Sequence, residues 1–502
     1  MYPFVCFCLL LGLCWWSLDS GFHWDEGIQI ELVQQTLQSG SLLPSWYNYP
    51  SMSYWLSLTS LLPHLPTAMT PPPLTDYLLD VSTRPRFFMQ VKFVFLLVSC
   101  LTVFWVYTAV RLTGRTPLEA AVAPAMLIGS WEMGYHMRWI APDGILMQWG
   151  ALWLLCMVAA SQQKRLRWAY GAAAVAGLAC GTKYPGGLLL IPTLGWIVWY
   201  LWEKRPSLWT SGCVLFTAAL IAAAAYLLST PGTLLQWPTF LSNVQYELNH
   251  YQQGHYGHTI TAGWPHLKQM IIYLTAVQLA PYRPLALFLS SLAMIGLGWL
   301  WRYQQATAVA TVSFPVLYIA YFAMQNVMIV RNLLVLLPFG VWLTALGVLA
   351  VYDWLPQKRY QSLWVLLLAG VIGINWYWLG YSSFTIKERL TNRFTAEAVA
   401  YLSQQADMVW LSPAVADALH RPQGNGPTAV IYAHELFPQP TDWPANNPDL
   451  YDRQFGPFEV NFAYYPSWIG NERLLILTAP QQQWLCQMAT TQLLLSLPAC
   501  VN

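Results

Sequence analysis

Charged side chains are scarce in this sequence of 502 residues, since Asp, Glu, Lys and Arg make up only 9% of it. Soluble globular proteins carry roughly 25%. Apolar residues make up 56%, and together these figures exclude a disordered chain, a fibrous repeat and an ordinary soluble enzyme. A formal net charge of +2 without a basic stripe gives no case for a nucleic-acid partner. The composition predicts a polytopic α-helical membrane protein.

Metal-binding cysteine motifs are also missing. Seven of the nine cysteines lie in apolar runs, where they are expected to act as small hydrophobic residues. The other two, Cys486 and Cys500, lie in a polar region, and a disulfide between them is possible if that region lies outside the cytoplasm. No obligatory cofactor is predicted, although a divalent metal remains an option.

Long hydrophobic runs are present in number. A helix needs about 20 apolar residues to cross the hydrocarbon layer, and about eleven spans are predicted. The run 51–62 is short and ends at Pro63, so it is interpreted as an interfacial helix. The predicted spans are 2–18, 93–110, 117–131, 144–160, 168–182, 185–202, 208–228, 284–301, 307–324, 333–352 and 361–380.

Short clusters of Lys and Arg mark the cytoplasmic side of a membrane protein. Here they lie between alternate spans, which places the amino terminus inside, the carboxyl terminus outside, and residues 19–90 and 230–283 in large outer loops. The clusters are Arg111/Arg115, Lys164/Arg165/Arg167, Lys204/Arg205, Arg302 and Lys358/Arg359.

The composition changes near residue 381, so a transmembrane domain of residues 1–380 is predicted to precede an extracytoplasmic domain of residues 381–502. The pattern in the second domain predicts a small α/β fold. Its expected elements are a helix over 394–406 and strands over 408–412, 428–433 and 474–478.

Ionisable side chains gather on the outer side of this topology. Asp25 and Glu26 open an amphipathic segment that Gly40 and Pro44 close. Acidic residues are favoured in the first turn of a helix, so a structural role is one interpretation. The other is catalytic: Asp25, with Glu26 beside it, as a general base that takes a proton from an acceptor hydroxyl or amine.

Three cations, Arg138, Lys183 and Arg331, come from separate hairpins but share the outer side. Converging cations bind phosphate and stabilise a departing phosphate group, so a lipid phosphate held at the interface is one hypothesis. The alternative is that each cation extends toward the headgroups at the end of a span.

The outer loops also supply candidate pocket residues, namely Tyr49, Asp143, His255 and His258. With His250, the two histidines could suggest a metal site, but loop histidines that form hydrogen bonds are the commoner case. We therefore assign them to a substrate pocket and predict no metal ligand.

Several segments in order resemble the GT-C glycosyltransferases of the protein O-mannosyltransferase and aminoarabinose-transferase type. They are FHWDEG, YNYPSMSYWL, RPRFF, MRWIAPDGILM, GLACGTKYPGGLLLIP, HYQQGHYGH and VRNLLVLLPFG, and they cover roughly residues 20–350. Family members often have Pro-Pro where this chain has Pro50-Ser51, and the aminoarabinose transferases tend to have Glu-Lys where Asn48-Tyr49 stands. The second difference weakens an assignment to lipid A modification.

The resemblance implies transfer of a sugar from a polyprenyl-phosphate donor to an unknown glycan, lipid or protein acceptor on the outer face. It implies that Asp25 is the base, that attack inverts the anomeric carbon, and that Arg138, Lys183 and Arg331 lie near the donor head group. A monophosphate leaving group can be met by such cations, so no metal is obligatory. A prokaryotic inner membrane is the preferred location.

Two other function classes stay open. A transporter or flippase would place ionisable groups near the bilayer midplane, often with internal repeats, whereas here they cluster at one interface. A non-catalytic scaffold that presents the tail domain would tolerate the loss of Asp25.

Overall fold

The computed structural model describes residues 2–18, 26–64, 84–254, 258–388, 409–418, 422–432, 436–437, 449–451, 474–487 and 492–493. The chain forms two compact units, the first made of Met1–Leu18 and Asp25–Tyr381 and the second of Asp19–Trp24 and Ser382–Asn502.

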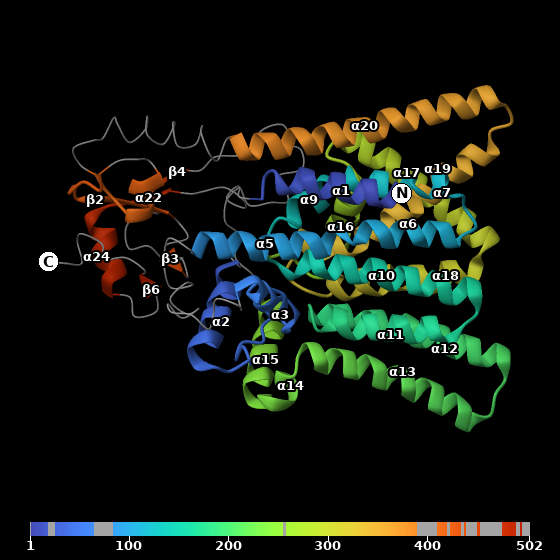
Figure 1. Cartoon of the computed structure of the whole chain (residues 1–502), viewed down its shortest axis with the longest axis horizontal. Coiled ribbons are helices and arrows are strands. Elements are labelled where there is room, and N and C mark those ends of the chain that lie inside the picture. The colour runs from blue at the N-terminus through green and yellow to red at the C-terminus, as the bar shows by residue number, and fades with distance from the viewer. Residues whose placement is uncertain are drawn as a thin grey trace. The chain divides into compact units, whose positions relative to one another are not determined.

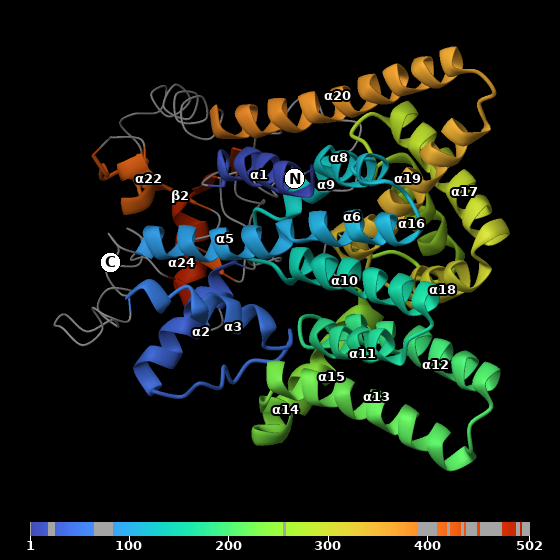
Figure 2. The same ribbon diagram turned by 45° about the vertical axis from the view of Figure 1, so that its right-hand side comes forward.

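The first unit is a bundle of helices that run side by side in both ribbon views (Figures 1 and 2). Among the described residues, eight segments are long and apolar enough to cross a membrane: Phe87–Leu112, Pro142–Gln163, Tyr184–Lys204, Leu208–Ser229, Arg283–Tyr303, Gln305–Ala323, Val330–Trp354 and Lys358–Tyr381. The helices that build them are α5 (Arg84–Cys100), α6 (Thr102–Leu112), α10 (Pro142–Gln163), η2 (Tyr184–Leu189), α12 (Leu190–Lys204), α13 (Leu208–Ser229), α17 (Arg283–Tyr303), α18 (Gln305–Ala323), η3 (Val330–Leu336), α19 (Leu337–Trp354) and α20 (Lys358–Glu388).

The predicted number of eleven spans is not confirmed, because three of the predicted segments form shorter helices. The run 2–18 forms α1 (Tyr2–Trp15) of 14 residues, and 168–182 forms α11 (Leu166–Cys180) of 15. The run 117–131 is divided into α7 (Pro117–Ala120), α8 (Val122–Ile128) and the start of α9 (Trp131–His136). At a rise of about 1.5 Å per residue, each is shorter than the roughly 30 Å hydrocarbon layer.

Burial separates a central pair of spans from peripheral ones. Within an 18-residue window of each span, 89% of the residues are buried in Pro142–Gln163 and 83% in Val330–Trp354, so these two spans form the core. In the windows of Leu208–Ser229 and Lys358–Tyr381, only 11% and 17% of the residues are buried. Two glycines bring α17 against α19, since a Cβ at Gly296 or Gly347 would overlap backbone of the other helix. Small residues at such crossings are typical of membrane helices.

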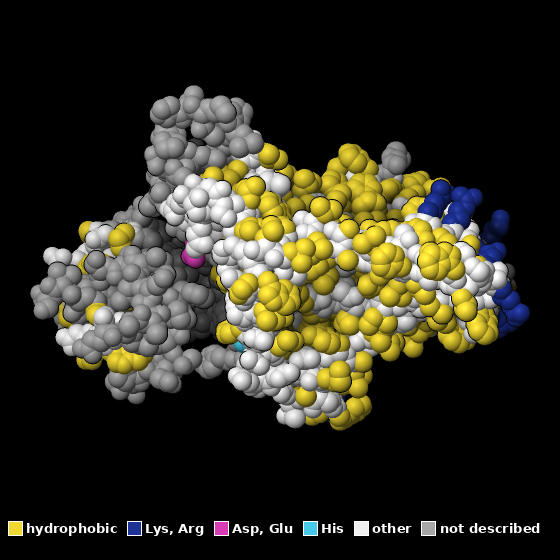
Figure 3. Space-filling view, turned by 90° about the horizontal axis from the view of Figure 1, so that it is seen from below, with side chains coloured by type: hydrophobic (Ala, Val, Ile, Leu, Met, Phe, Trp, Pro, Cys, Tyr) yellow, Lys and Arg dark blue, Asp and Glu magenta, His cyan; other side chains and the backbone are white. Residues whose placement is uncertain are grey.

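The Lys and Arg side chains that mark the alternate hairpins gather at one end of the bundle (Figure 3). Helix α10 ends next to Lys164 and α12 ends at Lys204, next to Arg205. Helix α19 ends at Trp354, shortly before Lys358 and Arg359, with which α20 begins. The three spans therefore begin at the opposite end, where the other polar groups lie.

Shorter helices cover that opposite end of the bundle. They are α2 (Glu26–Ser39), α3 (Met52–Thr59), η1 (Leu62–His64), α14 (Gly232–Leu235), α15 (Trp237–Gln253) and α16 (Trp264–Ala276). The predicted amphipathic segment is confirmed as α2, which buries Ile30 and Val33 against Phe87, Val91 and Ile145. Gly40, with φ of +69°, ends it in the left-handed conformation that favours glycine. The run 51–62 forms the eight-residue α3 and the turn η1, too short to cross a membrane.

The second unit contains a four-stranded sheet in the order β1-β2-β5-β4, with β1 and β2 parallel and the other pairs antiparallel. The strands are β1 (Val409–Leu411), β2 (Thr428–Tyr432), β5 (Leu474–Leu477) and β4 (Asp449–Tyr451), beside a two-stranded pair, β3 (Leu436–Phe437) and β6 (Gln492–Leu493). Two helices accompany them, α22 (Pro413–Ala418) and α24 (Ala479–Gln487). All three predicted strands are confirmed. The predicted helix 394–406 lies outside the described residues, and so does Cys500. Cys486 is disulfide-bonded.

Candidate active site

Three spans contribute one ionisable side chain each to a buried cluster at the end opposite the basic hairpins. Asp143 lies in the first turn of α10, Lys183 directly precedes η2, and Arg331 lies in η3. Lys183 Nζ donates to Asp143 Oδ1 at 2.8 Å, and Arg331 Nε lies 3.5 Å from Asp143 Oδ2. We call these three residues the cationic cluster. They are at most 6% exposed, so the predicted convergence of Lys183 and Arg331 occurs around a carboxylate.

Lys183 has further partners that fix its direction. Its ammonium also donates to Asn332 Oδ1 at 2.5 Å, and it lies 5.7 Å from the centroid of the Tyr49 ring. Tyr49 and Asp143, both predicted as pocket residues, therefore lie beside the same cation. A cation over an aromatic face is attracted by the ring quadrupole.

Two cations of the cationic cluster meet one carboxylate. Lys183 and Arg331 both approach Asp143, and all three side chains are buried. Buried charges are costly unless they are paired. Cations that converge in this way also bind phosphate groups, so the cluster is a candidate site for an anionic ligand.

A second group of polar side chains lies on α9 and extends to α16. Tyr273 donates to Glu132 Oε2 at 2.6 Å, and His136 Nε2 lies 3.7 Å from the same oxygen. Burial raises the pKa of Tyr135, Glu132 adds to the rise, and Arg138 and Arg331 oppose it. Tyr135 is therefore within electrostatic reach of both arginines. Arg138 is also buried, and burial lowers the pKa of its guanidinium.

Glu26 is engaged in a buried ion pair. Its Oε2 lies 3.4 Å from Lys92 Nζ, and its Oε1 accepts the backbone N–H of Ile140 at 2.8 Å. Lys92 Nζ lies 4.8 Å from the centroid of the Trp139 ring. These contacts fasten the start of α2 to α5 and to the loop before α10. Glu26 was predicted together with Asp25 as catalytic, and these contacts show that its carboxylate also holds the start of α2.

The two segments that were predicted as large outer loops contact each other through one face of α15. Asn48 Nδ2 donates to Glu247 Oε1 at 2.9 Å, and the backbone N–H of Tyr47 donates to Asn243 Oδ1 at 2.6 Å. At the end of the same helix, Tyr251 reaches Asn332 beside Lys183. This face therefore connects the first loop to the cationic cluster.

The segment after α15 is joined to the start of η3 by backbone contacts. The backbone carbonyl of His258 accepts the N–H of Met328 at 2.9 Å, and Thr259 pairs with Val327 in an isolated bridge. His258 is therefore placed near the segment that leads to Arg331, while Asp25 and His255 lie outside the described residues. Within the part of the chain that the structure describes, no group of three His, Cys, Asp or Glu side chains could hold a metal ion.

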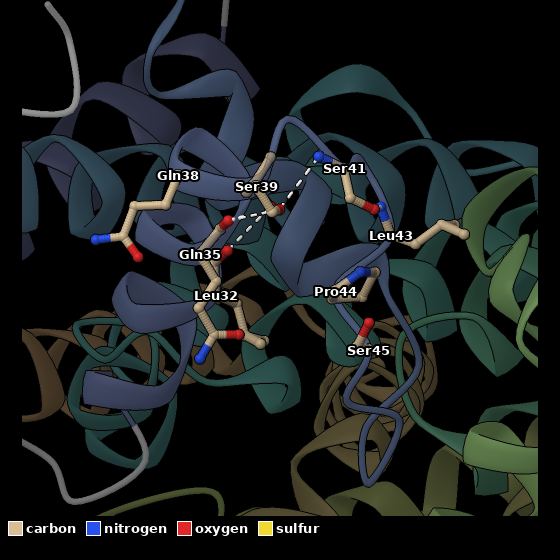
Figure 4. Close-up of a pocket in the computed structure, with 9 residues that line it drawn as sticks. Leu32, Gln35, Gln38, Ser39, Ser41, Leu43, Pro44 and Ser45 are labelled. Atoms are coloured by element: carbon tan, nitrogen blue, oxygen red, sulfur yellow. Dashed lines mark hydrogen bonds between the residues drawn. The ribbon is translucent and has the colours of Figure 1, made fainter.

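A separate pocket of about 490 Å³ lies between α2 and the loop after it (Figure 4). Its lining residues are Leu32, Gln35, Thr36, Gln38, Ser39, Ser41, Leu43, Pro44 and Ser45, none of which is charged. Ser39 Oγ donates to the backbone carbonyl of Gln35 and accepts the N–H of Ser41. An uncharged lining offers no counter-charge to a phosphate, so we do not place an anionic head group there.

Sequence reasoning missed Tyr251 and Asn332 as parts of this end of the bundle, and it placed Lys92 on or near this side without predicting its partner Glu26. The sequence position of Lys92 could have indicated that it has a partner, since an ionisable residue at the edge of an apolar run requires one. Asn332 directly follows Arg331, but only the fold shows that its side chain faces Lys183.

Comparisons with known proteins agree with the resemblance seen in the sequence. Residues 70–229 match the family described as dolichyl-phosphate-mannose-protein mannosyltransferase. No curated protein sequence matches the chain.

The fold is similar to that of an oligosaccharyltransferase from Archaeoglobus fulgidus in the apo form. The TM-score is 0.50 at 11% identity, over 89% of this chain and 61% of that one. The chain thus spans about three fifths of that protein. A helical membrane protein with the GT-C fold and a small α/β tail, as predicted, is confirmed.

Two structures of ArnT from Cupriavidus metallidurans are also similar. The apo structure has a TM-score of 0.47 at 13% identity, over 85% of this chain and 92% of that one. The structure bound to undecaprenyl phosphate has a TM-score of 0.45 at 13% identity, over 86% and 93%.

Proposed function

We propose that this chain is a membrane glycosyltransferase that moves a sugar from a polyprenyl-phosphate donor to an acceptor at the outer face of the membrane. The observation that carries the proposal is the cationic cluster, in which Lys183 and Arg331 converge on Asp143 in a buried environment. The description of the matching family names dolichyl-phosphate-mannose, and a lipid monophosphate is an anion of the kind that converging cations bind.

The side of the membrane follows from the basic hairpins. Lys and Arg are retained on the cytoplasmic side, so the opposite end, with the cationic cluster, is assigned to the outer face of a prokaryotic inner membrane. The disulfide bond of Cys486 supports an outer location for the tail, because such bonds persist in oxidising compartments.

The proposed reaction is a single displacement with inversion. Asp25 accepts the proton of the acceptor group while the acceptor atom forms a bond to the anomeric carbon. The bond between that carbon and the phosphate oxygen breaks, and its electron pair leaves with the lipid phosphate. Lys183 and Arg331 stabilise the additional negative charge on the departing phosphate, and we assign Arg138 to the same role. Glu26 holds the start of α2, next to Asp25, through its ion pair with Lys92.

The base is tested with the purified protein and a polyprenyl-phosphate sugar whose product is identified by mass spectrometry. Asp25→Asn is expected to lower turnover by about 10²-fold or more, the range of general-base catalysis. Asp353→Asn, at the basic end of the bundle, serves as the control and should retain turnover. Wild-type turnover by a folded Asp25→Asn variant overturns the assignment of the base, whereas lipid movement without a covalent product would identify a flippase instead.

The donor site is tested by the affinity for undecaprenyl phosphate in detergent micelles. Lys183→Ala and Arg331→Ala are each expected to weaken binding about tenfold, since a hydrogen bond to a charged group is worth about 1.5–3 kcal/mol. Lys164→Ala, which removes an exposed cation at the basic end, should leave the affinity unchanged. Equal affinity in both active-site variants and the control would exclude the cationic cluster as the donor site.

A further inference from the structure

Four hydrogen bonds hold the side chain and the backbone of Asn332 in place. Its side-chain Oδ1 accepts from Lys183, and its Nδ2 donates to the Tyr251 hydroxyl at 3.2 Å. Its backbone carbonyl accepts the Tyr318 hydroxyl at 2.8 Å, and its backbone N–H donates to Ile329. Asn332 is 1% exposed, so the oxygen and the nitrogen of its side-chain amide are both held in a buried environment.

These contacts determine which end of the amide faces the cation. An amide can present either its oxygen or its NH₂ group to a neighbour. The Tyr251 hydroxyl provides an acceptor for Nδ2, and this leaves Oδ1 directed at the Lys183 ammonium. The reversed amide would place two N–H donors against a positive charge, which is unfavourable.

We propose that Asn332 and Tyr251 are positioning residues that keep Lys183 available to the donor phosphate. An ammonium has three donors, and in this arrangement Asp143 and Asn332 take two, which leaves the third for a ligand. Without the Asn332 oxygen, the ammonium is free to turn fully onto the Asp143 carboxylate. This inference rests on the proposed function, because it concerns the same binding site for the donor phosphate.

The position of Tyr251 adds a link to the outer loops. It lies at the end of α15, whose polar face bonds Tyr47 and Asn48 through Asn243 and Glu247. The backbone carbonyl of Tyr251 accepts the N–H of Asn326 at 2.9 Å, which ties the helix end to the segment before η3. The orientation of Lys183 thus depends on the second outer loop being in place.

The experiment measures binding of undecaprenyl phosphate, and of undecaprenol as the uncharged probe, to purified variants in micelles. Asn332→Ala and Tyr251→Phe are each expected to weaken phosphate binding three- to tenfold and to leave undecaprenol binding unchanged. Asn249→Ala and Tyr246→Phe, exposed on the same helix, are the matched controls. In turnover assays the same two variants should raise the KM for donor more than they lower kcat.

A double variant separates positioning from a general loss of structure. If Tyr251 acts through Asn332, the combined variant Tyr251→Phe/Asn332→Ala should be no weaker than Asn332→Ala alone, since coupled residues are not additive. Additive losses, or equal losses for the phosphate and the alcohol, would overturn the inference. If Lys183→Ala weakens phosphate binding but Asn332→Ala and Tyr251→Phe match the controls, only this inference fails. If Lys183→Ala has no effect, the proposed donor site itself fails.

Discussion

The ion pair between Glu26 and Lys92 provides a quantitative test of how the start of α2 is held. Glu26 is 0% exposed and Lys92 is 2% exposed, with 3.4 Å between Oε2 and Nζ. Removal of one partner from a buried pair costs about 3–5 kcal/mol, because the remaining charge loses that counter-charge. Glu26→Gln keeps an oxygen for the N–H of Ile140 and removes only the charge. We therefore expect it to lower the free energy of unfolding by about 3 kcal/mol.

The double variant Glu26→Gln/Lys92→Met is expected to recover most of this loss, since replacement of a whole buried pair is often neutral or stabilising. Lys164→Met serves as the exposed control. Its pair with Glu203 is 48% and 39% exposed, and such pairs contribute about 0.2–1 kcal/mol. The measurement is reversible denaturant unfolding in mixed micelles. A loss below about 1 kcal/mol in Glu26→Gln, similar to the control, would refute the reasoning.

Two further predictions concern packing and pH. Gly347→Ala is expected to destabilise the protein by about 1–3 kcal/mol, the range for overpacking, because its Cβ would overlap the carbonyl oxygen of Leu292. Gly298→Ala, which meets open space, should have little effect in the same unfolding assay, and equal losses would contradict the close crossing. Burial lowers the pKa of His266 below its ordinary value of about 6.5, although its bond to the Gln325 carbonyl opposes the shift. As pH falls below about 6.5 the unfolded chain binds a proton first, so stability decreases until the lower folded pKa is reached. His266→Gln should reduce this loss in unfolding curves between pH 5 and 8, and an unchanged pH dependence would argue against the buried neutral ring.

The sidedness of the proposed site is tested by cysteine labelling in a variant without reactive native cysteines. Gln38→Cys, in the exposed part of α2, should react with an impermeant maleimide from outside intact cells. Arg165→Cys should react only after the membrane is opened. The reverse pattern would place the cationic cluster on the cytoplasmic side.

The sequence by itself determined the membrane class, eight of the spans and the basic end of the bundle. These features are local, because each span is a continuous apolar run and each basic cluster lies in one hairpin. The sequence also identified Lys183 and Arg331 as cations that share one side. The predicted number of eleven spans is not confirmed, because runs such as 117–131 are divided into short helices, with α8 beginning at Val122 and α9 at Trp131.

Only the tertiary structure decided which of these groups meet. Asp143 bonds to Lys183 and lies beside Arg331, residues 40 and 188 positions away. Glu26 pairs with Lys92 across a separation that no periodicity indicates. A helix pattern reports which face of one segment is apolar, whereas the contacts between ionisable groups depend on how whole helices pack, and that information is distributed over the entire chain.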